Sequence, residues 1–281
     1  MKLNKFLLTV ALFLGLNLVA NDSFTHIRNA TAKINYAGVT FLLDPYLAPK
    51  DAYEGFAGTV NSHLRNPRLH LPFSTDEILK GVDAVIVTHT HDDHWDKAAQ
   101  ELIPKDMPIF VQHSEDKKLL KTQGFKNITV IFESVNFNGV ELHKTGGAHG
   151  STQMYANAGL GELLGDAMGV VFKATGHKSL YVVGDTIWTA DVNKAFIKHK
   201  PEIIVLNTGY AQVLGFENES IIMGKNDVKM ASELMPNSLI ISVHMDAVNH
   251  AMLSRDELRE FIKTESIKNA IVPNDGEKIE F

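Results

Sequence analysis

The residues best suited to carry out chemistry lie in a short segment crowded with histidines and aspartates. Residues 88–96 read Thr-His-Thr-His-Asp-Asp-His-Trp-Asp, which places His89, His91, Asp93 and His94 within six residues of one another. Imidazole nitrogens and carboxylate oxygens are donors that suit zinc and related divalent ions. A solvated polar loop with a helix cap is the alternative, but three histidines and an aspartate at this density argue against it. We therefore predict a metal site here.

Three further candidate ligands occur one at a time along the chain. His149 lies in a glycine-rich loop, Asp185 stands in Gly-Asp-Thr just after an apolar run at 179–183, and His244 directly follows another at 239–243. Each has an ordinary alternative as a loop histidine, a turn aspartate or a histidine at a strand end. Sites are nevertheless often built from loops held by a rigid scaffold, so we take all three as candidate ligands.

The elements that must position these residues alternate between strands and helices. A buried strand over 82–88 runs into the first ligand segment, and a long loop is expected over 48–72. Such alternation predicts a layered α/β architecture. Without a linker-like stretch, we expect one domain over residues 21–281. The other predicted strands are 31–36, 39–43, 107–111, 128–131, 140–143, 170–174, 179–183, 203–206, 239–243 and 270–272, and the helices are 74–79, 97–102, 114–122, 191–199, 226–234 and 255–264.

Composition excludes several classes of protein. The chain has 281 residues, of which 44% are hydrophobic and 21% are charged, a balance typical of globular proteins. A net charge of −6 without a basic block argues against a nucleic-acid partner. The absence of cysteine excludes disulfide scaffolds, iron–sulfur clusters and thiol catalysis, and leaves thirteen histidines as nitrogen ligands.

The first twenty residues have the pattern of a bacterial signal peptide. Lys2 and Lys5 precede an apolar run over 6–20, and Leu-Val-Ala before Asn21 is a plausible cleavage site. The run is short for a membrane span of about twenty residues. We predict a cleaved leader and a periplasmic or secreted protein without a stable membrane anchor. An uncleaved N-terminal anchor is the alternative.

The ordered motifs resemble those of the metallo-β-lactamase superfamily. His-x-His-x-Asp-His after a strand, a later histidine, the aspartate of Gly-Asp-Thr and a final histidine together span residues 89–244. The early hairpin ending in Leu-Leu-Asp-Pro-Tyr-Leu at 42–47 also resembles the metal-dependent hydrolases that include ascorbate-6-phosphate lactonases. The resemblance implies a four-layer αββα sandwich, with two mixed sheets inside, helices outside and metals at one edge.

The same resemblance implies a ligand set for two divalent ions. Zinc is expected first, with manganese or iron as alternatives. Two adjacent ions can share a hydroxide and lower its pKa towards neutrality. Asp93 and Asp185 are the implied catalytic residues, Asp93 as a ligand, a proton acceptor or both. The implied ligands are His89, His91 and His149 for the first ion, Asp93, His94 and His244 for the second, and Asp185 as the bridge.

Hydrolysis of a small molecule is the function that this ligand set implies. Relatives that reduce oxygen or nitric oxide at two irons carry glutamate where this chain has His91. We predict cleavage of a small ester, lactone or phosphodiester. The alternatives are a β-lactam hydrolase, or a non-catalytic metal-binding protein of the same fold.

Several other residues could support the ligands or meet the substrate. Metal-bound histidines usually donate their outer N–H to a carboxylate or carbonyl, a role open to Asp44, Asp92 or Asp246. Asp44 is equally explained as a turn residue. His250 could point into the site or cap the helix that begins near Ser254.

The long loop and one tyrosine raise a similar question. Tyr210 could stabilise developing negative charge or simply pack. Four loop residues could meet an anionic substrate, although solvated side chains are the preferred interpretation: His63, Arg65, Arg68 and His70.

Overall fold

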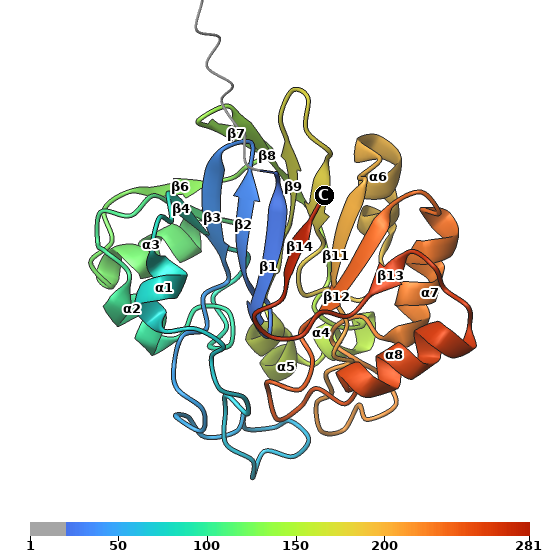
Figure 1. Cartoon of the computed structure of the whole chain (residues 1–281). Coiled ribbons are helices and arrows are strands. Elements are labelled where there is room, and N and C mark those ends of the chain that lie inside the picture. Colours follow the sequence, from blue (N-terminus) through green and yellow to red (C-terminus); the bar gives the residue numbers. More distant parts are fainter. Residues whose placement is uncertain (1–20) are drawn as a thin grey trace, which may run out of the picture.

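Two seven-stranded sheets lie face to face in the computed structural model, which describes residues 21–281 (Figure 1). The predicted signal peptide lies outside these residues. In the first sheet the order is β14-β1-β2-β3-β4-β5-β6; neighbours from β14 to β3 are antiparallel, and those from β3 to β6 are parallel. Its strands are β1 (Ser23–Arg28), β2 (Thr31–Tyr36), β3 (Val39–Leu43), β4 (Ala84–Val87), β5 (Ile109–Val111), β6 (Ile128–Val130) and β14 (Lys278–Glu280).

The second sheet repeats this plan. Its order is β13-β12-β11-β10-β9-β8-β7, parallel from β13 to β10 and antiparallel from β10 to β7. Each sheet therefore contributes a parallel half, whose strands end at a common edge. The strands are β7 (Ser134–Phe137), β8 (Val140–Thr145), β9 (Gly169–Lys173), β10 (Leu180–Val182), β11 (Ile203–Asn207), β12 (Leu239–Val243) and β13 (Ala270–Ile271).

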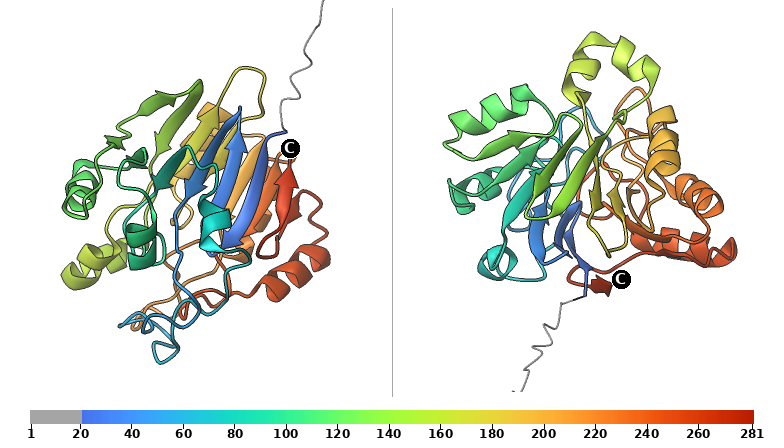
Figure 2. Two further views of the ribbon diagram at one scale, coloured as in Figure 1. Left: turned by 60° about the vertical axis from the view of Figure 1, so that its left-hand side comes forward. Right: turned by 90° about the horizontal axis from the view of Figure 1, so that it is seen from above.

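Helices cover both outer faces (Figures 1 and 2). Those numbered α1 to α3 pack on the first sheet, those numbered α6 to α8 on the second, and α4 and α5 lie at one end. These layers confirm the predicted α/β sandwich. The helices are α1 (Thr75–Leu79), α2 (Lys97–Leu102), α3 (Ser114–Thr122), α4 (Thr152–Ala156), α5 (Ala158–Leu164), α6 (Ala190–His199), α7 (Lys225–Leu234) and α8 (Arg255–Thr264).

The hydrophobic pattern explains why the sheets are buried on both sides. Alternate residues of a strand point to opposite faces. In β4, Ala84 and Ile86 face the second sheet, whereas Val85 and Val87 face the helices. A strand covered on both sides must be apolar throughout, as β4 is.

Five elements were not predicted: β1, β7, β14, α4 and α5. Strand β1 lacks an apolar run, because Ser23, His26 and Arg28 are polar and yet buried. Arg28 is 0% exposed and donates to the carbonyl oxygens of Leu69 (2.8 Å), Tyr46 (2.6 Å) and Ala48 (2.9 Å). The strand is thus specified by contacts with the distant loop.

The predicted loop over 48–72 contains neither helix nor regular strand, and is visible below the sheets in Figure 1. It is ordered by contacts with later parts of the chain, including an isolated bridge between Thr59 and Val213. Within residues 21–281, no helix has the length and apolar character needed to cross a membrane.

Candidate metal centre

The candidate ligands lie where the parallel strands of both sheets end. His89 to His94 follow β4, Asp185 follows β10, and His244 follows β12. His149 enters from the loop after β8. The topology therefore brings residues up to 155 positions apart to one edge of the sandwich.

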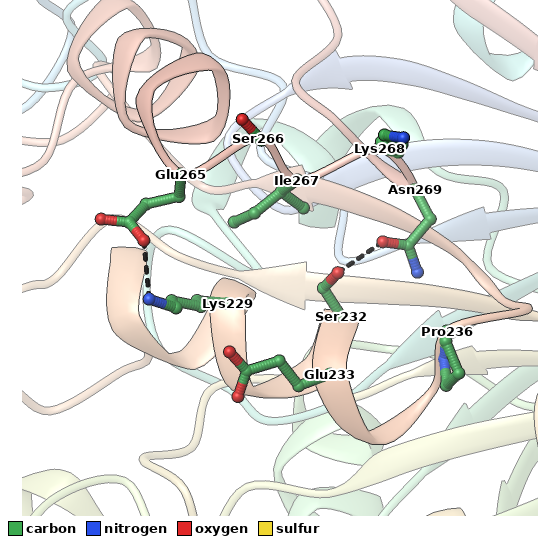
Figure 3. A pocket seen from close by; sticks show the side chains of 9 residues that line it. All are labelled: Lys229, Ser232, Glu233, Pro236, Glu265, Ser266, Ile267, Lys268 and Asn269. Carbon is green, nitrogen blue, oxygen red and sulfur yellow. Dashed lines mark hydrogen bonds and ion pairs between the residues drawn. The ribbon is translucent and has the colours of Figure 1, made fainter.

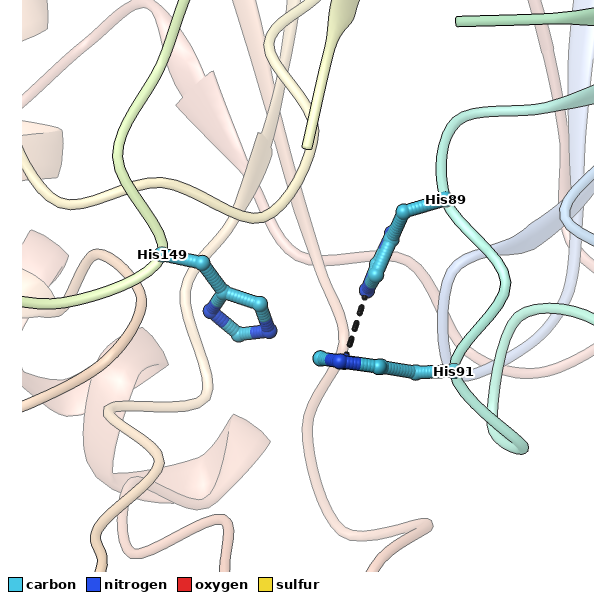
Figure 4. Close-up of side chains that lie close together, drawn as sticks. All are labelled: His89, His91 and His149. Carbon is cyan, nitrogen blue, oxygen red and sulfur yellow. Dashed lines mark hydrogen bonds between the residues drawn. The ribbon is translucent and has the colours of Figure 1, made fainter. Parts of the chain in front are cut away.

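The first group of donors contains only histidines: His89, His91 and His149. Their nearest ring nitrogens all lie within 4.8 Å of one another. Nε2 of His89 is 3.1 Å from Nδ1 of His91. Figure 4 shows the three rings converging from two separate loops. Three imidazole nitrogens around one point form a suitable site for a divalent ion.

A second group combines Asp93, His94 and His244. Nε2 of His244 lies 3.2 Å from Oδ2 of Asp93 and 3.1 Å from Nε2 of His94. All three side chains are buried. This group offers one carboxylate oxygen and two nitrogens to a second ion.

Asp185 stands between the two groups. Its Oδ2 is 3.1 Å from Nε2 of His94, 3.4 Å from Nε2 of His244 and 3.6 Å from Nε2 of His149. Its other oxygen, Oδ1, accepts a hydrogen bond from Nδ2 of Asn207 at 2.6 Å. The structure therefore brings all seven candidate ligands together and gives Asp185 the position of a bridge.

The outer nitrogens of the first group are oriented by backbone carbonyls. Nε2 of His91 donates to the oxygen of Leu163, and Nδ1 of His149 donates to that of Ile221, both at 2.8 Å. A histidine that donates from one nitrogen keeps the lone pair of the other free for an ion. These tautomers fit a metal at the centre of the group.

Asp44 supports both groups at once. It accepts from Nδ1 of His94 at 2.9 Å and from the Oγ1 of Thr88 at 2.7 Å. The same Oγ1 lies 3.2 Å from Nδ1 of His89, which can donate to it. Of the two predicted roles of Asp44, support of the ligands is therefore realised. The other candidates do not take this role: Asp92 is exposed, and Asp246 pairs with Arg255 at 2.8 Å.

Asn29 and Asn207 contact the ligands but were not predicted. Nδ2 of Asn29 lies 3.2 Å from Oδ2 of Asp93. The backbone carbonyl of Asn29 accepts a hydrogen bond from the backbone N–H of His244. Both asparagines end apolar or buried strands, and for Asn207 that position after the run at 203–206 was a usable signal. Asn29 follows a strand that the sequence pattern concealed.

Left-handed backbone accompanies the site. The φ angles are +58° at Asn29, +41° at Asp44 and +65° at His244. This region is unfavourable for most residues, and such strain often concentrates at functional sites. Gly209 packs so closely that a Cβ there would collide with the carbonyl of His244, so only glycine fits.

The charges within the ligand cluster suit a cation site. Burial lowers the pKa of His244, but the nearby carboxylates of Asp185 and Asp93 outweigh it and raise that pKa to about 9. His94 is held well above its usual pKa in the same way. Burial raises the pKa of both carboxyl groups, but His94 and His244 outweigh it and hold each well below its usual value. The carboxylates thus retain protons on neighbouring imidazoles, a positive charge that a divalent ion can replace.

A cavity of about 360 Å³ opens over the ligands. Polar residues, including His91, Asp93, His149 and Asp185, form its floor. No lysine or arginine is among its described lining residues. The cavity is suited to an uncharged molecule with an apolar substituent. Its apolar walls come from the long loop, α5 and the segment between β11 and α7: Phe56, Ala57, Leu163, Leu164, Val213 and Ile221.

The remaining predicted substrate contacts lie elsewhere. Arg65 pairs with Glu54 and donates to the carbonyl of Asp51. Tyr210 is 36% exposed, its ring lies beside Gly224, and it does not line the cavity. His63 and His70 are exposed, and none of the four loop residues lines the cavity.

A separate hollow lies between α7 and the segment after α8 (Figure 3). Its polar side chains bond to one another, with Lys229 2.6 Å from Glu265 and Ser232 2.5 Å from Asn269. It contains none of the predicted site residues.

Comparison with known proteins agrees with this geometry. The family model for the beta-lactamase superfamily domain matches residues 40–253. The UPF0173 protein YddR of Bacillus subtilis is 46% identical over 260 residues, which cover 92% of this chain and 100% of that protein. More distant relatives are named metal-dependent hydrolases, including one from Methanocaldococcus jannaschii that is 25% identical over 79% of this chain and 92% of its own.

Two solved structures are similar over nearly their whole length. A "possible metal-dependent hydrolase" from Veillonella parvula has a TM-score of 0.92 and 53% identity, covering 93% of this chain and 100% of its own. An isothiocyanate hydrolase from Delia radicum gut bacteria has a TM-score of 0.89 and 47% identity, covering 92% and 99%. The finer resemblance to ascorbate-6-phosphate lactonases stays a prediction. The chain belongs to the metallo-β-lactamase superfamily, among its metal-dependent hydrolases.

Proposed function

We propose that this protein hydrolyses isothiocyanates, R–N=C=S, to an amine and carbonyl sulfide at a dinuclear metal centre. The observation that carries the proposal is the 47% identity, over 92% of the chain, to an isothiocyanate hydrolase. The cavity supports it, because an isothiocyanate is uncharged and commonly carries an apolar substituent.

Seven side chains would hold two ions, with zinc expected first and manganese or iron as alternatives. When bound, two such ions would supply Lewis acidity and a hydroxide at neutral pH. The ligands are His89, His91, Asp93, His94, His149, Asp185 and His244.

In the reaction, the oxygen of water bonds to the central carbon of the isothiocyanate and the carbon–nitrogen bond then breaks. Both protons of the water end on the nitrogen, so the amine and carbonyl sulfide account for every atom. Asp93 lines the cavity, where its carboxylate can hold a proton during the transfer. Phe56, Val213 and Ile221 bind the apolar substituent and exclude bulk water.

A neutral lactone or ester is the second candidate substrate. It would fit the same uncharged cavity and react at the same centre. Phosphodiesters are less favoured, because beyond the metal ligands the cavity offers no lysine or arginine to the remaining charge of an anionic group.

The test compares these substrates on one metal-replete preparation. We expect consumption of benzyl isothiocyanate with release of benzylamine in equal amounts, and little reaction with bis-p-nitrophenyl phosphate. A lactone completes the panel, and the Asp185→Asn variant serves as the inactive control. Rapid lactone cleavage with no amine release from the isothiocyanate would refute the proposal in favour of the second candidate.

We also propose that the protein is exported to the periplasm or medium after cleavage behind Ala20, acting on small molecules and not on nucleic acid. The support is the charged and apolar pattern of residues 2–20. Intact-mass analysis of protein from a bacterial host should give an N-terminus at Asn21. Exclusive recovery in the cytosol with Met1 retained would refute export.

A further inference from the structure

One buried histidine in the cavity belongs to none of the ligand groups. His250 is 6% exposed and lines the cavity together with Asp93 and Asp185. Within residues 21–281, its Nδ1 has no hydrogen-bond partner. Because this nitrogen is sealed from solvent and the ring lines the cavity, Nε2 is the nitrogen that a molecule in the cavity can meet. The ring thus presents Nε2 as its free polar atom in the cavity.

The ring of His250 is nevertheless held firmly. The ring of Phe56 meets it edge to face, with centroids 5.2 Å apart and planes at 87°. Its carbonyl accepts from the backbone N–H of Gln212 at 3.0 Å. The preceding residue, Asn249, accepts from the N–H of Phe56 at 3.0 Å and donates to Oγ1 of Thr59 at 2.8 Å. A fixed ring with an unused donor is a pre-organised group for a ligand.

The alternative predicted role of His250, as a cap of α8, is absent. Oγ of Ser254 caps that helix and accepts from the N–H of Glu257 at 3.2 Å. The hollow beside α7 contains no histidine, and the histidines of the long loop are exposed. His250 is therefore available to the substrate.

We propose that His250 is a catalytic residue that contacts the substrate nitrogen through Nε2–H. This assignment rests on the proposed isothiocyanate hydrolysis. As the carbon–nitrogen bond breaks, Nε2–H donates a hydrogen bond to the nitrogen and stabilises the negative charge that develops there, while both protons that the amine gains come from the water. Burial lowers the pKa of the ring to about 4, so the ring is neutral and carries one N–H near pH 7. Removal of one such donor to developing charge typically lowers a rate about 10²–10³-fold.

The test varies the leaving amine. The nitrogen of 4-nitroaniline disperses negative charge into its ring, so its departure depends less on a hydrogen-bond donor than the departure of aniline does. His250→Phe should therefore lower kcat/KM for phenyl isothiocyanate about 10²-fold, and that for 4-nitrophenyl isothiocyanate by about tenfold or less. His250→Gln, which keeps an N–H donor but in a different position, should give an intermediate loss. Rates without enzyme are subtracted for both substrates.

Metal content and thermal unfolding of the same preparations separate catalysis from structure. We expect both variants to match the wild type in metals per chain, and His63→Phe, an exposed histidine of the long loop, to keep full activity. An equal loss on both substrates, or a loss that follows metal content, would overturn the assignment. So would full activity of His250→Phe. If the wild type itself releases no amine, the proposed function fails first and the role of His250 fails with it.

Discussion

Asp185 occupies the only described position from which one carboxylate reaches nitrogens of both ligand groups, 3.1 Å from His94 and 3.6 Å from His149. A negative charge between two cations offsets their repulsion and fixes their separation. Asp44 acts one step further out, on His94 directly and on His89 through Thr88. At the scale of residues, the site is therefore a set of metal ligands whose orientation is fixed by neighbouring residues that are not ligands themselves.

The Asp185→Asn substitution tests the bridge. Asparagine keeps the shape but removes the charge, so we expect metal content to fall from about two ions per chain towards one, with hydrolysis reduced about 10²-fold or more. Elemental analysis and kinetics on one preparation measure both. Thermal unfolding should still be cooperative, because the core does not depend on the metals. Two retained metals with near-full activity would make Asp185 a turn residue only.

The Asp44→Asn substitution tests the support. An amide cannot accept from Thr88 and His94 as a carboxylate does, so metal affinity should fall about 10–100-fold while the seven ligands remain. Competition with a chromophoric chelator measures the affinity. Asp51→Asn, on the exposed long loop, is the matched control and should leave it unchanged. Equal affinity of both variants would show that Asp44 merely shapes its turn.

At the scale of elements, the long loop over 48–72 decides the shape of the cavity, although it has no regular structure of its own. Asn249 joins it to the segment after β12: its Oδ1 accepts from Phe56 and Asn66, and its Nδ2 donates to Thr59 and to the carbonyl of Val60. One amide thus uses its full bonding capacity to hold the wall that bears Phe56.

The Asn249→Ala substitution should loosen this wall. Losing a buried amide and leaving its partners unsatisfied costs about 2–4 kcal/mol of unfolding free energy. We expect KM for an apolar substrate to rise while metal content is unchanged. Urea unfolding and steady-state kinetics measure the two effects. Ser62→Ala, an exposed change in the same loop, is the control. Unchanged stability and KM would mean that other contacts hold the loop.

At the scale of the whole molecule, the two sheets have the same plan, and the carboxyl ends of their parallel strands meet at one edge of the sandwich. The interior between them is apolar, with Phe24, Phe41 and Phe172 fully buried. A body stabilised in this way also buries a few histidines in their neutral form. His199 on α6 is one: burial, with Lys173 and His143, lowers its pKa to about 4.

Stability should consequently fall on acidification. Because the folded pKa of His199 lies below the ordinary value of 6.5, the unfolded chain binds the proton first. The contribution of neutral His199 to the unfolding free energy is therefore complete above pH 6.5 and is lost as the pH falls towards 4. His199→Gln should reduce the drop in unfolding free energy between pH 7.5 and 5, measured in urea. His63→Gln, an exposed change, should keep the wild-type drop. Parallel pH curves for wild type and His199→Gln would contradict this.

Much of this protein could be predicted from its sequence because its strongest signals are local. The apolar runs of β4 and β12 are buried on both faces, and such strands need no distant information to be recognised. The dense segment from His89 to His94 predicted a metal site by its residue types alone. The choice of His149, Asp185 and His244 as partners depended on strand-end positions and on the resemblance to a known superfamily.

Only the tertiary structure decided how those residues combine. Asn29 and Arg28 belong to a polar strand whose burial depends on contacts with residues far along the chain, which no local pattern records. Asp44 and His250 each had two plausible roles, and the packing of β3 against β4 and of Phe56 against His250 selected one. A side chain's type is fixed by sequence, but its partners depend on which loops the sheets bring together.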